Sequence, residues 1–303
     1  MRIFHFHLLL GTALALLASA QDAAPKDRNE INSGAKPGGM MADSPITFPV
    51  AAQFPADLRA RSYPAEKDYF IMDDNRRSLA QIRQILAKMP KGEFAPLTNK
   101  REHAKQSLQR LTSGGELHIL MLGDSIINDT ARSGWITLLR DHYPAAKIRG
   151  TIYVRGGGNC GHFQAEERVR KHILPLRPDL VIIGGISQRD IASIQEVIRQ
   201  IRAGLPDCEF LLTTGVFGTA DPRSAEAMAK ARHSGTGLYG AELQNLAEAE
   251  RCAYLDMTTP WVQYIQSSGL HPHAFYRDAV HANEYGEQIL AKILLRWWTM
   301  PES

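Results

Sequence analysis

From Glu116 to the end of the chain, short apolar runs alternate with longer amphipathic segments. Parallel strands that are buried on both faces are nearly all apolar, and the helices that cover them are apolar on one side only. Five runs fit this description, at residues 118–122, 148–154, 180–183, 210–213 and 253–255. The alternation therefore predicts a doubly wound α/β domain, a three-layer α/β/α sandwich built on a five-stranded parallel sheet.

The intervals between these runs have helical periodicity. We expect one helix directly after the first strand, and further helices at residues 135–142, 165–174, 191–203, 240–250 and 283–298. No internal repeat is visible. The main domain is thus predicted to span residues 115–303.

The first twenty residues have the composition of a signal peptide. Arg2 precedes an apolar run at residues 8–17, and Ala18-Ser19-Ala20 forms a small-residue cleavage site. The apolar run is too short for a permanent anchor, and no later stretch reaches about 18 uninterrupted apolar residues. We therefore expect cleavage after Ala20, export to the periplasm or the medium, and no stable membrane insertion.

Two further segments precede the main domain. Residues 21–44 contain few apolar side chains and are predicted to form a flexible linker. Residues 45–114 begin with proline-punctuated sequence and continue with helical periodicity at Leu79, Ile82 and Ile85, and again at Leu108 and Leu111. We expect this part to be an N-terminal extension that packs on the main domain.

Charge and cysteine content exclude several classes of protein. The formal charge of +3 falls to +2 once Arg2 is removed with the leader, which is too small to favour a nucleic-acid partner. The 3 cysteines, Cys160, Cys208 and Cys252, are too few for a disulfide scaffold, and we expect each to be a small buried side chain. Whether Cys208 and Cys252 pair stays open, as does the oligomeric state.

A serine follows the first predicted strand in the sequence Gly123-Asp124-Ser125. Ligands of open parallel sheets bind at the carboxyl ends of the strands, and backbone N–H groups at a helix N-terminus can hold an oxyanion. The alternative is purely structural, with Gly123 ending the strand and Asp124 or Ser125 capping a helix. Asn128 and Asp129, one helical turn later, are expected to support the turn that contains Ser125.

A hydroxyl needs a base to act as a nucleophile, and Asp278-Ala279-Val280-His281 supplies a candidate just before the last predicted helix. A spacing of three residues lets one tight turn bring both side chains together. His281 would accept the Ser125 proton, and Asp278 would orient the imidazole. Alone this pattern is common in surface turns, so its value depends on its combination with Ser125.

Together these two blocks resemble those of the SGNH/GDSL hydrolases, which have a nucleophile block near the first strand and an acid–base block before the last helix. The resemblance covers roughly residues 115–298 and implies a flavodoxin-like fold and a serine esterase without a cofactor. In that family the oxyanion is bound by the nucleophile's own N–H, by an N–H from a glycine turn after the second strand, and by an Asn side chain after the third.

Mapping those oxyanion donors onto this sequence gives Ser125 itself, then Gly158 or Asn159 in the turn at residues 155–161, and Gln188 after the third strand. Gln188 departs from the family pattern, which has Asn at this position. Its amide offers the same N–H donors on a stem that is one methylene longer. Ser187 is the alternative donor. Losing one such donor costs about 3–4 kcal/mol of transition-state stabilisation, so Gln188 bears directly on catalytic efficiency.

Two other motifs in the sequence are incomplete. Residues 156–161 satisfy the G-x-G-x-x-G pattern, but they follow the second strand, and no acid ends the next strand to bind a ribose. His271-Pro272-His273 could suggest a metal site, yet an extended chain would turn the two rings apart and no further ligand is clustered there. His162 is expected either to touch the substrate or to pack.

The favoured substrate class, by analogy with the family, is a short acyl group such as acetyl on a small carbohydrate or a polysaccharide. A lipase or lysophospholipase is the enzymatic alternative. The alternative from another class is a carbohydrate-binding relative of the fold with weak or no catalysis, which the departure at Gln188 favours.

Overall fold

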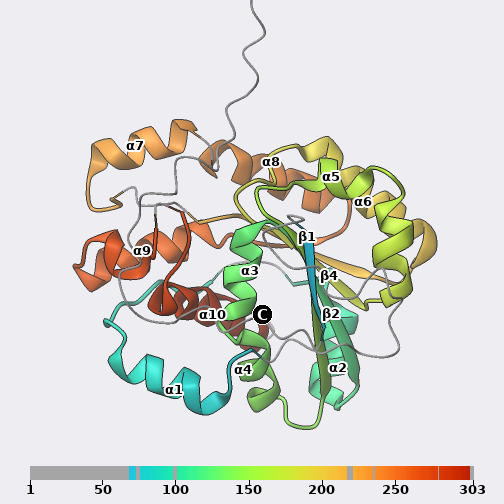
Figure 1. Ribbon diagram of the computed structural model, residues 1–303, viewed down its shortest axis with the longest axis horizontal. Helices are drawn as coiled ribbons and strands as arrows, with labels where there is room; N and C mark the ends of the chain where they lie inside the picture. Colours follow the sequence, from blue (N-terminus) through green and yellow to red (C-terminus); the bar gives the residue numbers. More distant parts are fainter. Residues whose placement is uncertain are drawn as a thin grey trace, which may run out of the picture. The chain divides into compact units, whose positions relative to one another are not determined.

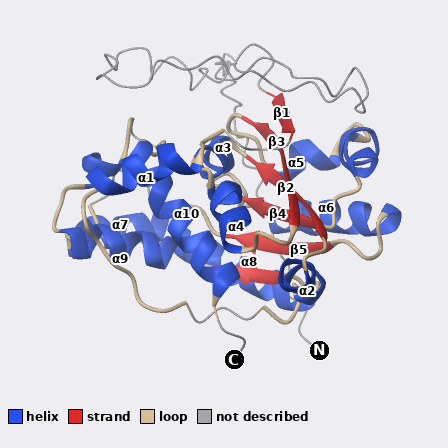
Figure 2. Ribbon diagram, turned by 90° about the horizontal axis from the view of Figure 1, so that it is seen from below, coloured by secondary structure: helices blue, strands red, loops and turns tan. Residues whose placement is uncertain are grey.

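The computed structural model describes residues 68–72, 76–97, 101–216, 221–234, 236–278 and 280–300. The expected signal peptide, the linker and residues 45–67 of the extension lie outside this part of the chain. In the described part, helices cover both faces of one central sheet (Figures 1 and 2). No helix there is long and apolar enough to cross a membrane.

The sheet has the strand order β1-β3-β2-β4-β5-β6. Its strands are β1 (Asp68–Met72), β2 (Glu116–Gly123), β3 (Lys147–Arg155), β4 (Leu180–Gly184), β5 (Glu209–Thr213) and β6 (Ala253–Leu255). β2 to β6 are parallel, and their order is that of the flavodoxin-like doubly wound fold. The predicted five-stranded parallel α/β/α sandwich is confirmed.

The edge strand β1 was not predicted. It pairs antiparallel with β3, from Asp68 opposite Arg155 to Met72 opposite Thr151. An antiparallel edge strand is a common addition to a parallel sheet. β1 therefore covers the outer edge of β3, which would otherwise be open.

Two hydrophobic cores form on the two faces of the sheet, because alternate residues of each strand point to opposite sides. In β2, Ile119 and Met121 belong to one core, and Leu120 and Leu122 belong to the other. The first core contains residues of α3, α4, α9 and α10, and the second contains residues of α5, α6 and α8. Burial on both faces explains why these strands are continuous apolar runs.

The α-helices are α1 (Leu79–Lys88), α2 (Lys105–Ser113), α3 (Ser125–Arg132), α4 (Trp135–His142), α5 (Cys160–Gln164), α6 (Ile191–Gly204), α7 (Ala225–Ser234), α8 (Thr236–Ala249), α9 (Thr258–Ser268) and α10 (Glu284–Thr299). α4, α6, α8 and α10 lie where helical periodicity predicted them. α5, α7 and α9 were not predicted. Leu108 and Leu111 of α2 are buried in the first core, within the segment that was expected to be an extension.

The single helix predicted at residues 165–174 was wrong. Glu166 and Glu167 have φ angles of 53° and 58°, in the left-handed region that interrupts a right-handed helix. The chain instead forms α5, then a π-helical turn (Val169–Ile173) and a 3₁₀ turn (Leu174–Leu176).

Strand register brings three loops to one edge of the sheet. Gly123 at the end of β2 lies opposite Val154 of β3 on one side and opposite Gly184 of β4 on the other. The residues that follow β2, β3 and β4 therefore start from neighbouring positions. This edge is where the nucleophile turn, the glycine turn and Gln188 all begin.

Candidate active site

Ser125 is the first residue of α3, directly after the β2 strand. Asp124 is the N-cap of α3, and its Oδ1 accepts a hydrogen bond from the Ile126 N–H at 2.8 Å. A helix that begins here leaves the Ser125 N–H without an intrahelical acceptor. The predicted cap and the predicted nucleophile are therefore two adjacent residues of one turn.

Asp124 also connects this turn to the loop after β4. Its Oδ2 accepts a hydrogen bond from the Ser187 N–H at 2.7 Å, and the side chain is fully buried. Gly185 is required beside it, since its φ is +107° and a Cβ there would lie 2.2 Å from Asp124 Oδ1. Burial raises the pKa of Asp124, although the hydrogen bonds from Ile126 and Ser187 oppose that effect.

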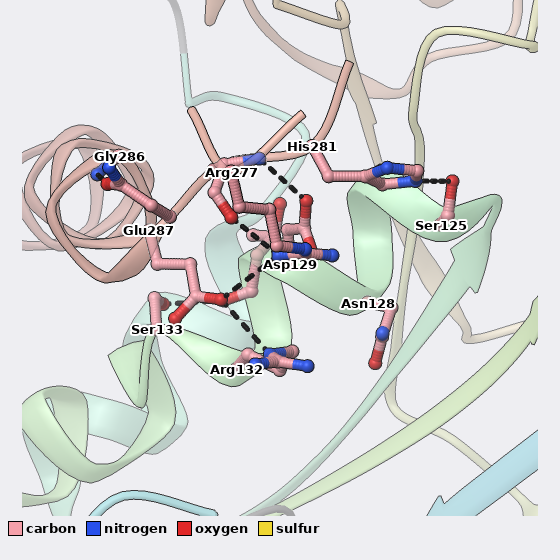
Figure 3. Close-up of polar contacts among 12 residues, drawn as sticks. Ser125, Asn128, Asp129, Arg132, Ser133, Arg277, His281, Gly286 and Glu287 are labelled. Carbon is pink, nitrogen blue, oxygen red and sulfur yellow. Dashed lines mark hydrogen bonds and ion pairs between the residues drawn. The ribbon is translucent and has the colours of Figure 1, made fainter. Parts of the chain in front are cut away.

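Ser125, His281 and Asp278 form one continuous chain of hydrogen bonds. His281 Nε2 lies 2.8 Å from Ser125 Oγ (Figure 3), and His281 Nδ1 lies 2.8 Å from Asp278 Oδ2. An ionised carboxylate can only accept, so Nδ1 bears the proton and Nε2 accepts from the serine hydroxyl. The structure thus brings together the three residues that the two sequence blocks predicted, although Ser125 and His281 are 156 residues apart.

The spacing between Asp278 and His281 has a local cause. Asp278 Oδ1 accepts hydrogen bonds from the backbone N–H groups of Val280 and His281, each at 2.8 Å. The carboxylate therefore closes the turn that presents the imidazole to it. Around this turn the chain returns on itself, since Tyr276 bridges to Ala282 and the Arg277 N–H donates to the His281 carbonyl at 3.0 Å.

The surroundings of His281 and Asp278 shift the pKa of each in the direction that general-base chemistry needs. Burial lowers the pKa of His281, but the hydrogen bond to Asp278 and the charges of Asp129 and Asp278 outweigh it, so the pKa is raised overall. Burial raises the pKa of Asp278, but hydrogen bonds from the His281 ring and from the His281 and Val280 N–H groups hold it far below its usual range. Asp278 therefore remains a carboxylate next to the imidazole.

The glycine turn follows β3 at the same edge of the sheet. The Gly158 N–H donates to the Arg155 carbonyl at 2.9 Å. The Asn159 N–H has no partner among the described residues. Of the two predicted backbone donors, Asn159 is thus the one whose N–H is available.

The amide of Gln188, predicted to be an oxyanion donor, makes hydrogen bonds to the glycine turn. Its side chain is fully buried, Oε1 accepts from the Cys160 N–H at 2.9 Å, and Nε2 donates to the Gly158 carbonyl at 3.3 Å. Sequence position alone indicated that the amide would reach the reacting centre. In the structure its two hydrogen bonds connect the loop after β4 to the glycine turn.

Several predicted supporting residues have other partners. Asn128 does not bind the nucleophile turn with its side chain, because its Oδ1 accepts from Arg76 Nη1 at 2.7 Å. His162 Nδ1 accepts a hydrogen bond from Arg155 Nη1 at 2.5 Å. The rings of His271 and His273 lie 4.3 Å apart at their centroids, because this segment is a 3₁₀ turn and not the expected extended chain.

Sequence reasoning missed Arg277, which directly precedes Asp278, and Glu287, which pairs with Arg277. Figure 3 shows them with Asp129 between the helix of Ser125 and the turn of His281. Glu287 did give a signal, because it shares a helix face with the apolar residues Leu290 and Leu294 and is 1% exposed. An acidic side chain on an apolar helix face indicates a buried cationic partner.

All three cysteines are buried free thiols in the structure. Burial raises the pKa of Cys208 and of Cys252, each to about 12. These thiols are therefore protonated and inert at neutral pH.

Comparison with solved structures defines the class of fold. A GDSL-like lipase from Parabacteroides merdae matches with a TM-score of 0.50 and 13% identity, over 60% of this chain and 96% of that one. No protein-family model and no curated protein matches the sequence. The chain has the SGNH/GDSL hydrolase fold.

Two of the similar structures are esterases that act on acetylated sugars. A two-domain esterase active on acetylated mannans matches with a TM-score of 0.52 and 14% identity, over 68% of this chain and 54% of that one, so this chain spans about half of its length. An acetyl-xylooligosaccharide esterase from Geobacillus matches with a TM-score of 0.50 and 19% identity, over 61% of this chain and 95% of that one.

Proposed function

We propose that this chain is a serine hydrolase of carboxylic esters, with Ser125 as nucleophile, His281 as base and then acid, and Asp278 as the residue that orients the imidazole. The supporting observation is the chain of hydrogen bonds, 2.8 Å from Ser125 Oγ to His281 Nε2 and 2.8 Å from Nδ1 to Asp278. Helix capping alone would explain Ser125 next to Asp124, but it gives no reason for His281 to contact the hydroxyl.

The proposed reaction has two half-reactions. Ser125 Oγ attacks the ester carbonyl carbon while His281 Nε2 accepts the hydroxyl proton, and the same proton then protonates the departing alkoxide. Water, deprotonated by His281, hydrolyses the acyl-enzyme and releases the acid. The Ser125 and Asn159 N–H groups are the proposed oxyanion donors, both of them rigid backbone donors.

Short acyl esters of carbohydrates are the proposed substrate class. The support is the likeness in fold to two esterases that act on acetylated sugars, together with a site whose His281 and Asp278 side chains are 23% and 28% exposed. An open site suits a small acyl group on a large hydrophilic carrier. The leader at residues 1–20 supports export, where such carriers are found.

A chain-length series of p-nitrophenyl esters tests this proposal. We expect kcat/KM to be highest for the acetyl ester and to fall with acyl length, and Ser125→Ala to reduce it by about 10⁴-fold or more. Ser113→Ala, on an exposed position of α2, is the matched control and should retain full activity.

Three results would contradict the proposal in different ways. Preference for long acyl chains would favour the lipase alternative. Absence of hydrolysis by the folded wild type, with retained binding of acetylated oligosaccharide, would favour a non-catalytic binding protein. Equal rates for the wild type and Ser125→Ala would exclude Ser125 as the nucleophile.

A further inference from the structure

A second carboxylate, Asp129, lies beneath the turn that contains His281. It is on α3, one helical turn after Ser125, and its side chain is fully buried. A carboxylate in this environment is costly unless each oxygen is paired. Its partners therefore indicate what it does.

Each oxygen of Asp129 binds a different end of the acid–base turn. Oδ1 accepts from Arg277 Nη2 at 2.7 Å, and Oδ2 accepts from the Ala282 N–H at 3.0 Å. Arg277 directly precedes Asp278, and Ala282 directly follows His281. One carboxylate thus holds both ends of the turn on the helix whose first residue is Ser125 (Figure 3).

Burial raises the pKa of Asp129, whereas the charges of Arg277 and His281 and the hydrogen bond from Arg277 oppose that effect and favour the carboxylate. Both of its oxygens accept from N–H donors, one of them a cationic guanidinium, and such donors bind the ionised carboxylate more strongly than the neutral acid. Arg277 in turn donates from Nη1 to the Ala282 carbonyl at 2.5 Å, and the same Nη1 lies 3.6 Å from Glu287 Oε1. Arg132 Nε binds the same Oε1 of Glu287 at 3.0 Å, and Arg77 binds its Oε2.

We propose that Asp129 and Arg277 are positioning residues for the proposed reaction: Asp129 fixes the His281 imidazole against Ser125, and the pair sets the charge that the imidazole experiences. This inference rests on the proposed function for its catalytic meaning, though not for its structural basis. Neither residue contacts Ser125 Oγ, so both act through His281.

Asp129 and Arg277 shift the pKa of His281 in opposite directions. Three charged groups face the imidazole, namely Asp278 and Arg277 on its own turn and Asp129 on α3. The negative charges of Asp278 and Asp129 favour the imidazolium and raise the pKa of His281, whereas the Arg277 cation lowers it. Loosening of the turn alone would instead shift the pKa in the same direction in either variant.

The test is an NMR titration of His281 in the full-length protein, with the resonance assigned from His281→Gln. Asp129→Asn keeps the shape of the side chain and removes its charge, and the pKa of His281 should fall. Arg277→Gln keeps a hydrogen-bond donor and removes the cation, and the pKa should rise. Asp129→Asn should also lower kcat by about 10- to 100-fold at unchanged KM, because the imidazole moves protons in the chemical steps and contributes little to binding of the intact substrate.

Asp179→Asn is the matched control. Asp179 also accepts one hydrogen bond from a backbone N–H, that of His118 at 2.7 Å, and pairs with an arginine, Arg110 at 3.2 Å. It lies just before β4, at the opposite end of the strand from the loop that bears Ser187. Its substitution should leave both the pKa of His281 and kcat unchanged.

Equal or same-direction shifts of the pKa of His281 in Asp129→Asn and Arg277→Gln would overturn the proposal. If Asp129→Asn does not fold, Arg277→Gln decides alone, since this side chain is 36% exposed and a rise in the pKa is still required. The titration needs no substrate, so a wild type that hydrolyses no ester would refute the proposed function without removing this test.

Discussion

At the scale of single residues, the site depends on how carboxylates are paired. Asp124, Asp129 and Asp278 each accept at least two N–H hydrogen bonds, and each connects segments that a helix or turn must hold together. Only Asp278 contacts the imidazole directly. Asp124 caps α3, Asp129 holds the turn that contains His281, and Asp278 orients the imidazole.

The pH dependence of the reaction follows from the direction of the His281 shift. The base must be neutral to accept a proton, and the pKa of His281 is raised above the ordinary value of 6.5. We therefore expect kcat/KM to be lost as the pH falls, with a midpoint above 6.5. Stopped assays of p-nitrophenyl acetate hydrolysis between mildly acidic and alkaline pH would measure this limb.

Asp278→Asn tests whether His281 is the group that titrates in this pH profile of kcat/KM. It removes the charge that raises the pKa of His281, so the acidic limb should move to lower pH, while kcat falls by about 10³- to 10⁴-fold. A midpoint below 6.5 in the wild type, or a limb that does not move in the variant, would contradict this account of the base.

At the scale of elements, Gln188 connects the loop after β4 to the glycine turn. Gln188→Met has a similar volume and removes both hydrogen bonds, which leaves the Cys160 N–H and the Gly158 carbonyl unpaired. We expect a loss of about 1–3 kcal/mol in the free energy of unfolding, measured by urea titration. A stable variant whose kcat alone falls by about 10²- to 10³-fold would instead indicate a direct oxyanion donor.

Elements whose surroundings are uniform could be predicted from the sequence. The five parallel strands are buried on both faces, so continuous apolar runs identified them, and α10 was located by its periodicity. β1 was missed because its strand character depends on pairing with β3, a distant segment. A single helix was wrongly predicted at 165–174, because periodicity does not reveal the left-handed backbone of Glu166 and Glu167.

Some residues of the site could likewise be predicted from the sequence, and others could not. Ser125, Asp278 and His281 could be located because their loops follow strands or precede a helix at one predictable edge. The contact of Arg277 with Asp129 spans 148 residues and has no local signature. Gln188 was in the expected loop, but only the path of the backbone decides whether its amide faces inward or toward a substrate.

At the scale of the whole molecule, one sheet serves two cores, so the described domain should unfold as a unit. β2 is paired on both sides, with β3 and β4, whereas β1 is paired only with β3. We expect the slowest amide hydrogen exchange in β2 and β4 and the fastest exchange, among the strands, in β1. Mass spectrometry of exchanged peptides would measure this order, and equal rates in β1 and β2 would contradict it.

The central claim is that Ser125 is a nucleophile activated by His281. Its most direct measurement is reaction of the folded protein with a fluorophosphonate probe, followed by mass spectrometry of the peptides. We predict one adduct per chain on the peptide that contains Ser125, slower labelling in His281→Ala, and no labelling in Ser125→Ala. A folded wild type that stays unlabelled, or an adduct at any other residue, would contradict the claim.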